Sequence, residues 1–274
     1  MVAESNLLNR QIDDIVQTVF EGADGEVYMV NPSREAIEAF VDVATDYDGS
    51  LPTVHLLADE RTLKAVMDDF IVASNAADLI DRDTLALRTL EEAPENSLFV
   101  TESSVIAIVH AGDRVGGLVS DDADFVEATR ETYAARWEDA ESFNLRTPPI
   151  SRVRETLSDE IGPSAESDFS TILGSLETAR GDGNGLDEVT ISLLVAARND
   201  ALLYDISKWG EDVGIASKAT FSRTKTKLED MGLIDTEKVP IDVGRPRLRL
   251  KMGDERLVDA DNSQVATVAQ SMLN

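Results

Sequence analysis

The stretch ISKWGEDVGIASKATFSRTKTKLEDMGLIDTEKVPIDVGRPRLRLK, residues 206–251, decides how the rest of the chain is interpreted. Its first apolar residues, including Trp209 and Val213, recur at helical spacing until Gly214. Glycine supplies the positive φ that a sharp turn between two helices needs. Ser217 is typical of the cap of a following helix. The pattern therefore predicts two short helices joined by a tight turn.

A β-hairpin is expected directly after the second helix. Leu233 and Ile234 open a strand, and RLRLK at 247–251 alternates polar and apolar residues as a half-exposed strand does. Gly244 and Pro246 bracket the tip between the two strands. Two helices and a basic hairpin make a winged helix-turn-helix, which places one helix in the major groove of DNA and a wing along the backbone.

Basic residues are concentrated in this same stretch. Residues 208–251 hold 10 of the 25 basic and 7 of the 53 acidic residues, a net charge of +3, while the remainder of the chain carries −31. Neutralising phosphates supplies most of the sequence-independent affinity for DNA. The charge distribution favours double-stranded DNA as the partner, and the alternative is a basic surface that binds an acidic protein or nothing.

The predicted DNA contacts follow the second helix and the wing. Residues at the helix start face the major groove, where arginine can read guanine and serine or threonine can bind phosphate. The full set is Ser217, Lys218, Thr220, Ser222, Arg223, Lys225, Lys227, Arg245, Arg247 and Arg249. A homodimer would set two reading helices one helical turn of DNA apart, about 34 Å.

Composition bounds the rest of the chain. At 274 residues two domains are expected. The chain has no cysteine, which excludes disulfides and thiolate metal sites, and no apolar run reaches the roughly 18–20 residues of a membrane span. We therefore expect a cytoplasmic protein without membrane contact. The net charge of −28 is typical of a salt-accumulating cytoplasm, because molar salt shortens the Debye length to about 3 Å.

Residues 1–146 predict a regulatory α/β domain of three layers with a mixed sheet. An amphipathic helix is expected over 4–21, and further helices after caps at Ser33, Asp59 and Asp121 or Asp122. The helix from Asp59 is expected to run through Ile71, and the last helix to bury Phe125 with its apolar face. Strands are expected at 26–31, 53–58, 84–90, 97–101, 105–110 and 115–120.

Residues 147–185 are expected to form a helical linker that can also dimerise, and residues 186–274 the winged helix-turn-helix domain. Thr147-Pro148-Pro149 stops the α/β domain, and the glycines at 181, 183 and 185 mark a break. A helix at 186–201 would open the DNA-binding domain.

Nothing in the sequence indicates catalysis, a metal site or a cofactor. His55 and His110 have no second ligand at metal spacing, and no phosphate-binding glycine loop follows a strand. A small-molecule effector site is more plausible at the ends of the first two strands, where helix N-termini favour anions. Its candidate residues, which plain helix caps would also explain, are Asn31, Ser33, Arg34, Asp59 and Arg61.

Two segments carry a resemblance to known regulators. GIASKATFSRTKTKLEDMGLI followed by GRPRLRL resembles the winged helix of archaeal TrmB-type regulators. DDADFVEATRETYAARWEDAESF is similar to the last helix of their phospholipase-D-like sensor domain, although the phospholipase His-x-Lys signature is absent. Over most of its length the chain resembles the haloarchaeal TbsP-type transcriptional regulators.

The resemblance implies a DNA-binding regulator of metabolic genes, with a non-catalytic, phospholipase-D-like sensor first and the DNA-binding domain last. TrmB-type proteins carry the reader first, so their route of signalling does not transfer. The competing hypothesis is an adaptor of the transcription machinery that uses its winged helix without touching DNA.

Overall fold

The computed structural model describes residues 6–23, 25–92, 94–112, 114–176, 178–180, 186–241 and 246–273. Two compact units are distinguished by their internal contacts. Unit 1 comprises residues 1–67 and 75–145, and unit 2 comprises residues 68–74 and 146–274. No helix in the described ranges is long and apolar enough to cross a membrane.

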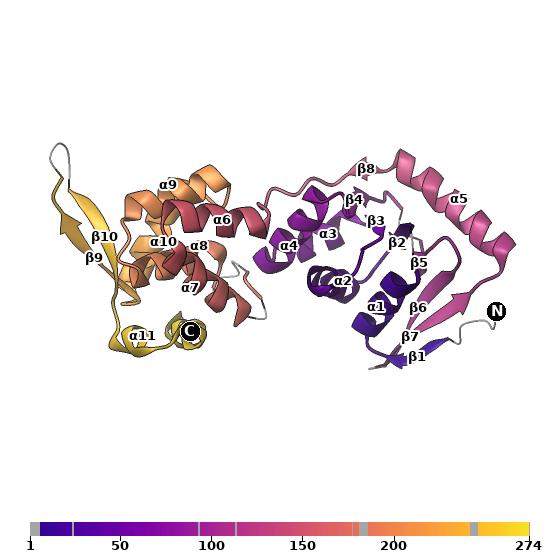
Figure 1. The fold of residues 1–274 in the computed structure, drawn as a ribbon, viewed down its shortest axis with the longest axis horizontal. Helices are drawn as coiled ribbons and strands as arrows, with labels where there is room; N and C mark the ends of the chain where they lie inside the picture. The colour runs from indigo at the N-terminus through magenta and orange to yellow at the C-terminus, as the bar shows by residue number, and fades with distance from the viewer. Residues whose placement is uncertain are drawn as a thin grey trace. The chain divides into compact units, whose positions relative to one another are not determined.

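Unit 1 is built on a mixed eight-stranded sheet (Figure 1). Its order is β1-β7-β6-β5-β2-β3-β4-β8, with β2, β3 and β4 parallel and the other pairs antiparallel. The strands are β1 Leu7–Arg10, β2 Glu26–Val30, β3 Thr53–Ala58, β4 Leu85–Thr89, β5 Ser97–Val100, β6 Val105–Ala111, β7 Arg114–Ser120 and β8 Glu141–Ser142. The helices are α1 Ile12–Gly22, α2 Arg34–Asp46, α3 Glu60–Val66, α4 Phe70–Asp81 and α5 Ala123–Asp139. The division between the units falls within α4, whose residues up to Ser74 belong to unit 2.

Helices cover both faces of this sheet, which confirms the predicted three-layer α/β architecture. On β2, Tyr28 and Val30 point to one face, where they cluster with Val126 and Trp137 of α5. Helices α1 and α2 lie on the opposite side (Figure 1). The alternation of side chains along a strand therefore divides the buried strand β2 between two separate cores.

Three helix predictions need correction. Residues 7–10 form strand β1 and not the start of a helix, because they pair with β7 and become the edge strand of the sheet. The helix from Asp59 ends at Val66, and Asp69 starts α4 by accepting a 2.9 Å hydrogen bond from the Ile71 N–H. Phe125 is 52% exposed, since only the Val126, Tyr133 and Trp137 face of α5 is buried.

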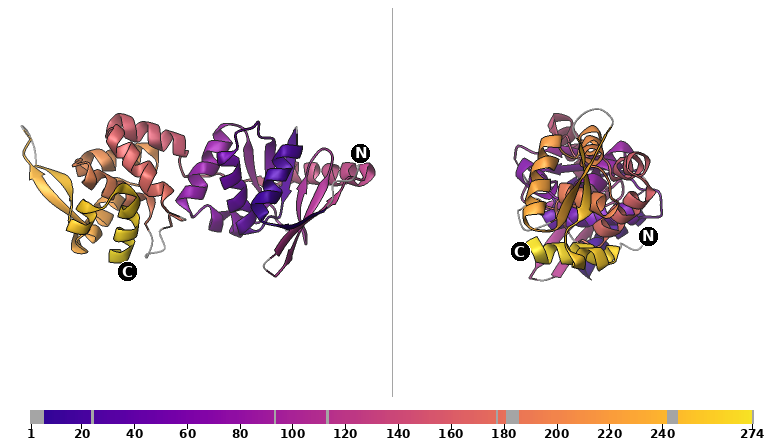
Figure 2. Two further views of the ribbon diagram at one scale, coloured as in Figure 1. Left: turned by 60° about the horizontal axis from the view of Figure 1, so that its bottom comes forward. Right: turned by 90° about the vertical axis from the view of Figure 1, so that its left-hand side faces the viewer.

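Unit 2 is a helical body with one hairpin, and residues 150–174 belong to it. Its helices are α6 Ile150–Glu160, α7 Pro163–Gly174, α8 Glu188–Arg198, α9 Leu203–Val213, α10 Lys218–Asp230, α11 Glu255–Asp259 and α12 Asn262–Leu273. Strands β9 Ile234–Val239 and β10 Arg247–Met252 pair antiparallel and project beyond the helices (Figure 2). Residues from all these elements share one core around α8, in which every residue from Val189 to Ala197 is buried.

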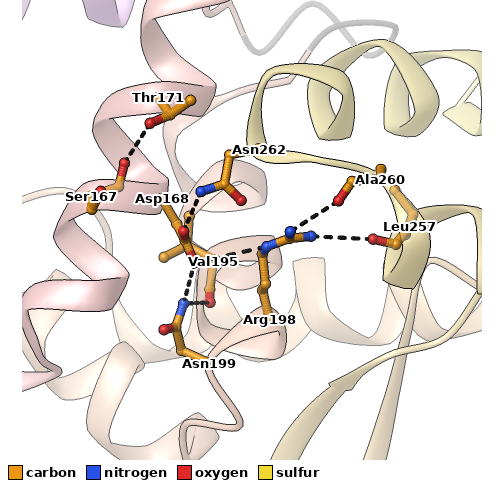
Figure 3. Close-up of polar contacts among 9 residues, drawn as sticks. All are labelled: Ser167, Asp168, Thr171, Val195, Arg198, Asn199, Leu257, Ala260 and Asn262. Carbon is orange, nitrogen blue, oxygen red and sulfur yellow. Dashed lines mark hydrogen bonds and ion pairs between the residues drawn. The ribbon is translucent and has the colours of Figure 1, made fainter.

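A polar cluster connects α7, α8 and the C-terminal helices of unit 2 (Figure 3). The Asp168 carboxylate accepts hydrogen bonds from the side-chain amides of Asn199, at 2.7 Å, and Asn262, and lies 3.9 Å from Arg198 Nε. The Arg198 guanidinium also donates to the carbonyls of Leu257, at 3.3 Å, and Ala260, at 2.9 Å. The cluster therefore holds the end of α11 and the start of α12 against α7 and α8.

Glu188 gives unit 2 a pH-dependent stability. Burial, reinforced by the charges of Asp187, Asp68 and Asp69, raises the pKa of Glu188 to about 6 from its ordinary 4.5. The folded protein therefore binds more protons than the unfolded chain between these values, so stability falls as pH rises through this window. At neutral pH the cost is about 2 kcal/mol, and Glu188→Gln is expected to stabilise the protein by up to about that amount.

Urea unfolding of wild type and Glu188→Gln across the pH range measures this effect. The two proteins should converge below the ordinary pKa of glutamate and diverge towards neutral pH. Because burial is the largest cause of the shift, the difference should persist in concentrated potassium chloride, which screens only the charge–charge part. Parallel stability curves at all pH values would contradict the assignment.

Candidate nucleic-acid interface

The turn between α9 and α10 has the geometry that the sequence predicts. Gly214 ends α9 in the left-handed conformation, with φ +98°. Ser217 then caps α10, and its Oγ accepts a hydrogen bond from the Thr220 N–H at 3.2 Å. A side chain at Gly214 would be strained in this conformation, so glycine here fixes the angle at which α10 begins.

The inner face of α10 sets which residues can face outward. Phe221 and Leu228 are buried in the core of unit 2 with Trp209 of α9. Gly210 of α9 allows the close approach, because a Cβ built there would lie 2.3 Å from two atoms of the Phe221 ring. Trp209 is fixed in turn by a 2.9 Å hydrogen bond from its Nε1 to Thr156 Oγ1 of α6.

The outer face of α10 is a shallow, open groove along the helix. It is lined by Ala219, Ser222, Arg223, Thr226, Lys227, Asp230 and Met231. Arg223 and Lys227 are both exposed, and within the described ranges neither has a carboxylate partner. Arg223 and Lys227 lie one helical turn apart, and because neither has a carboxylate partner in these ranges, both can bind an anionic ligand.

The other predicted basic residues of α10 have internal partners. The Lys218 ammonium lies 2.7 Å from Glu211 Oε2, and this hydrogen bond raises the pKa of Lys218. Lys225 is only 12% exposed and pairs with Glu229, whose other oxygen accepts a 2.6 Å hydrogen bond from Thr236. The aliphatic stem of Lys225 thus lies along the protein, and its charge is already neutralised by Glu229. Contact between Lys225 and DNA would require this partly buried ion pair to break, which costs free energy.

The basic residues of the hairpin are also held in place. The Arg247 guanidinium lies 4.1 Å from the centre of the Tyr204 ring and 3.3 Å from Asp205 Oδ1. Arg249 Nη1 lies 3.8 Å from Glu237 Oε2 on the paired strand. Arg245 lies outside the described residues. Arg247 therefore joins β10 to the start of α9 and fixes the direction of the hairpin relative to the helices.

Two residues of this surface were missed by sequence reasoning. Thr226 lies on the outer face of α10 between Ser222 and Lys227, and counting three or four residues from Ser222 and Arg223 would have found it. Lys238 of β9 is exposed and has no acid partner within the part of the chain that the structure describes. Lys238 pairs across the hairpin with the uncharged Leu248, so no opposite charge on the neighbouring strand drew attention to it in the sequence.

The predicted effector residues serve the strand ends of unit 1. Asn31 Nδ2 donates to the Pro94 carbonyl at 2.7 Å, and Arg34 donates to the Ala65 carbonyl at 3.1 Å. Ser33 caps α2, and Asp59 caps α3 while also accepting from the Thr62 hydroxyl, an interaction that lowers the pKa of Asp59. Arg61 is exposed. Four of the five side chains thus have local structural partners.

Two family comparisons match almost the whole chain. Residues 4–148 match the N-terminal domain of TbsP-like transcriptional regulators, and residues 149–270 match the C-terminal HTH domain of the same proteins. No curated protein matches the chain. The N-terminal match names no enzyme family, and the expected phospholipase-D-like character of unit 1 stays a prediction.

Solved structures give weaker likenesses. TrmBL2, described as an archaeal chromatin protein with a novel mode of DNA binding, is 17% identical, with a TM-score of 0.35 over 52% of this chain and 56% of that one. Little more than half of the TrmBL2 chain is thus represented. NucT from Helicobacter pylori is 13% identical, with a TM-score of 0.34 over 51% of this chain and 98% of that one. Neither likeness establishes a shared fold or function.

The family assignment therefore rests on the two domain matches, whose boundary at 148/149 lies close to the start of α6. They agree with the helix-turn-helix geometry of α9 and α10 and with the mixed-sheet unit that precedes it. The chain belongs to the TbsP-like transcriptional regulators, and its second part is their HTH domain.

Proposed function

We propose that the protein is a sequence-specific transcriptional regulator that binds double-stranded DNA as a homodimer, with α10 in the major groove and the β9–β10 hairpin along the backbone. The observation that carries the proposal is the outer face of α10. Arg223 and Lys227 are exposed there, without acid partners in the described ranges, in a stretch of net charge +3 within a chain of −28.

The residues of α10 divide into reading and positioning roles. Arg223 has the planar fork that binds guanine O6 and N7, and the short side chains of Ser222 and Thr226 allow the helix to approach the bases. Lys227 binds phosphate as a point charge. Ser217 and Thr220 fix the start of the helix, and Lys218 reaches phosphate only by leaving Glu211.

The hairpin supplies backbone contacts in this proposal. Arg247 and Arg249 are anchored by Asp205, Tyr204 and Glu237, so they hold the wing in its direction. Arg245, which lies outside the described residues, is proposed to follow the minor groove from the tip.

The acidic surface fits a regulator that works in a salt-rich cytoplasm. The acids outnumber the bases 53 to 25, and outside the reading stretch nearly all of the chain would repel DNA at low salt. Concentrated salt weakens counterion release, so affinity has to come from base contacts and apolar burial. Binding experiments therefore belong in about 2 M potassium chloride.

The test is a selection of bound genomic fragments, followed by titration of the enriched sequence and of an unrelated duplex. Arg223→Ala is expected to weaken binding to the enriched sequence by about 5- to 150-fold and to reduce discrimination between the two duplexes. Lys227→Ala is expected to weaken binding to both duplexes equally and to lower the slope of log K against log salt concentration by about one.

Arg256→Ala is the matched control, because Arg256 is an exposed arginine of unit 2 that pairs with Asp254 away from α10. It should bind like wild type. Unchanged discrimination in Arg223→Ala would remove α10 from the reading role. If wild type and both variants recovered genomic fragments without sequence preference, the result would instead favour an adaptor of the transcription machinery.

Regulation by a small-molecule effector at unit 1 is the second part of the proposal. The strand-end residues Asn31, Ser33, Arg34, Asp59 and Arg61 remain the predicted site, although local partners hold most of them. A ligand there would have to replace the Asn31 or Arg34 contacts to carbonyl groups, which links its binding to the strand ends themselves.

A further inference from the structure

An uncharged groove runs between α5 and the antiparallel strands of unit 1. Its volume is about 560 Å³, and its lining includes Leu98, Ala107 and Leu118 from the sheet and Phe125, Ala128 and Thr129 from the helix. Leu118 is 45% exposed and Phe125 is 52% exposed. Contiguous exposed apolar surface on a protein marks interaction sites, whereas single exposed apolar side chains are ordinary.

The strand register extends this surface beyond the groove. Ala107 pairs with Leu118 and Val109 with Gly116, so these side chains share one face of β6 and β7. Val109 is 44% exposed. Leu8 of β1 is 57% exposed and lies over Gly116, since its Cδ2 would be 3.3 Å from a Cβ at that position. We call this stripe from Leu8 to Phe125 the uncharged face.

The absence of charge is local to this side of α5. The other side of the same helix borders a cavity of about 680 Å³, lined by Glu127 and Glu131 of α5 together with Glu26 and Glu102. Among the residues that the structure describes, the groove lining holds no Asp, Glu, Lys or Arg, in a chain in which these make up 28% of the residues. Position around the axis of α5 thus separates a highly charged side from a neutral one.

We propose that the uncharged face is where two copies of the chain meet. A copy carries −28, so the contact of lowest repulsion between copies joins surfaces without carboxylates. A two-fold contact would bring the same exposed side chains, Leu118 and Phe125, of both copies together. Burying these exposed side chains supplies the driving force.

The proposal names the surface for the homodimer of the proposed DNA-binding function and rests on that function for its purpose. It assigns dimerisation to unit 1, whereas the sequence offered the helical segment at 147–185 as one candidate and did not determine which segment dimerises. Measuring association without DNA keeps the two ideas separable, because a monomer could still read a half-site.

The experiment determines mass by light scattering across a dilution series in about 2 M potassium chloride, without DNA. Wild type is expected to be a dimer. Phe125→Asp and Leu118→Asp, on different elements, are each expected to weaken association by at least about tenfold, since a desolvated charge at a central apolar contact is costly. Both side chains are already half exposed, so folding should survive, and circular dichroism verifies it.

Val258→Asp is the control, because Val258 is an equally exposed valine, at 58%, on α11 of unit 2. It should remain a dimer. A monomeric wild type, or a dimer unaffected by both substitutions on the uncharged face, would overturn the proposal. Monomeric variants that still discriminate a half-site would support it and leave the DNA proposal intact, whereas dimers that bind no sequence selectively would overturn only the DNA proposal.

Discussion

Gly210→Ala is expected to destabilise unit 2 by about 2–3 kcal/mol, although alanine is the better helix former by about 1 kcal/mol. The added Cβ would lie 2.3 Å from two ring atoms of Phe221, a contact that real structures do not tolerate. Phe221 is fully buried, so its ring has no open space to turn into. Relief requires α10 to move away from α9, which displaces the surface proposed to read DNA.

Urea unfolding measures the loss, and a DNA titration measures the displacement of α10. Gly174→Ala is the matched control, because this glycine ends α7 of the same unit and a Cβ there meets nothing within 4 Å. It should be neutral or slightly stabilising. Equal stability of the two alanine variants would contradict the close α9–α10 contact.

Asp168→Ala is expected to cost about 3 kcal/mol, the second large effect. The substitution removes the acceptor of the Asn262 amide, one of the two acceptors of the Asn199 amide and the acid near Arg198, while Asn199 keeps its bond to the Val195 carbonyl (Figure 3). Asp168 is only 13% exposed, so water replaces the lost contacts incompletely. The C-terminal helices should loosen first, since Arg198 is what binds the Leu257 and Ala260 carbonyls.

Hydrogen exchange of α12 and urea unfolding both test this expectation. Asp212→Ala removes an acid from the same unit, but its pair with Lys208 is half exposed and local to α9. Such an exposed pair contributes little to stability, so this control should unfold close to wild type. If α12 exchanged equally slowly in both variants, the polar cluster would not be what anchors it.

Local patterns predicted most of the fold because they reflect local physics. The helix-turn-helix was readable because Gly214 and Ser217 impose their conformations on the chain around them. The helix expected over 4–21 was wrong at its start, because residues 7–10 find a partner in β7, more than 100 residues away. Phe125 was misplaced for the same reason, since its exposure depends on how far α5 extends over the sheet.

The candidate site shows a similar limit. The sequence identified the basic stretch and the start of α10, and Arg223 and Lys227 lie on the outer face of that helix as expected. It did not reveal that Lys218 and Arg247 pair with acids of the same unit, because Glu211 and Asp205 come together with them only in the folded unit. The Lys225–Glu229 pair is local to α10, with i,i+4 spacing that the sequence already contains. Which cations are free is a property of tertiary structure.

The course of the chain through unit 2 has a practical consequence for dissecting the protein. Unit 2 includes residues 68–74, where Phe70 joins its core and the buried Asp69 binds the Ala179 N–H and Arg180. A gene fragment that begins at residue 149 omits this seven-residue piece and should fold less stably than its helices suggest. Loss of regulation on N-terminal truncation would then reflect a destabilised unit 2 and not the loss of a signal from unit 1. Adding residues 68–74 as a separate peptide should restore the stability of unit 2.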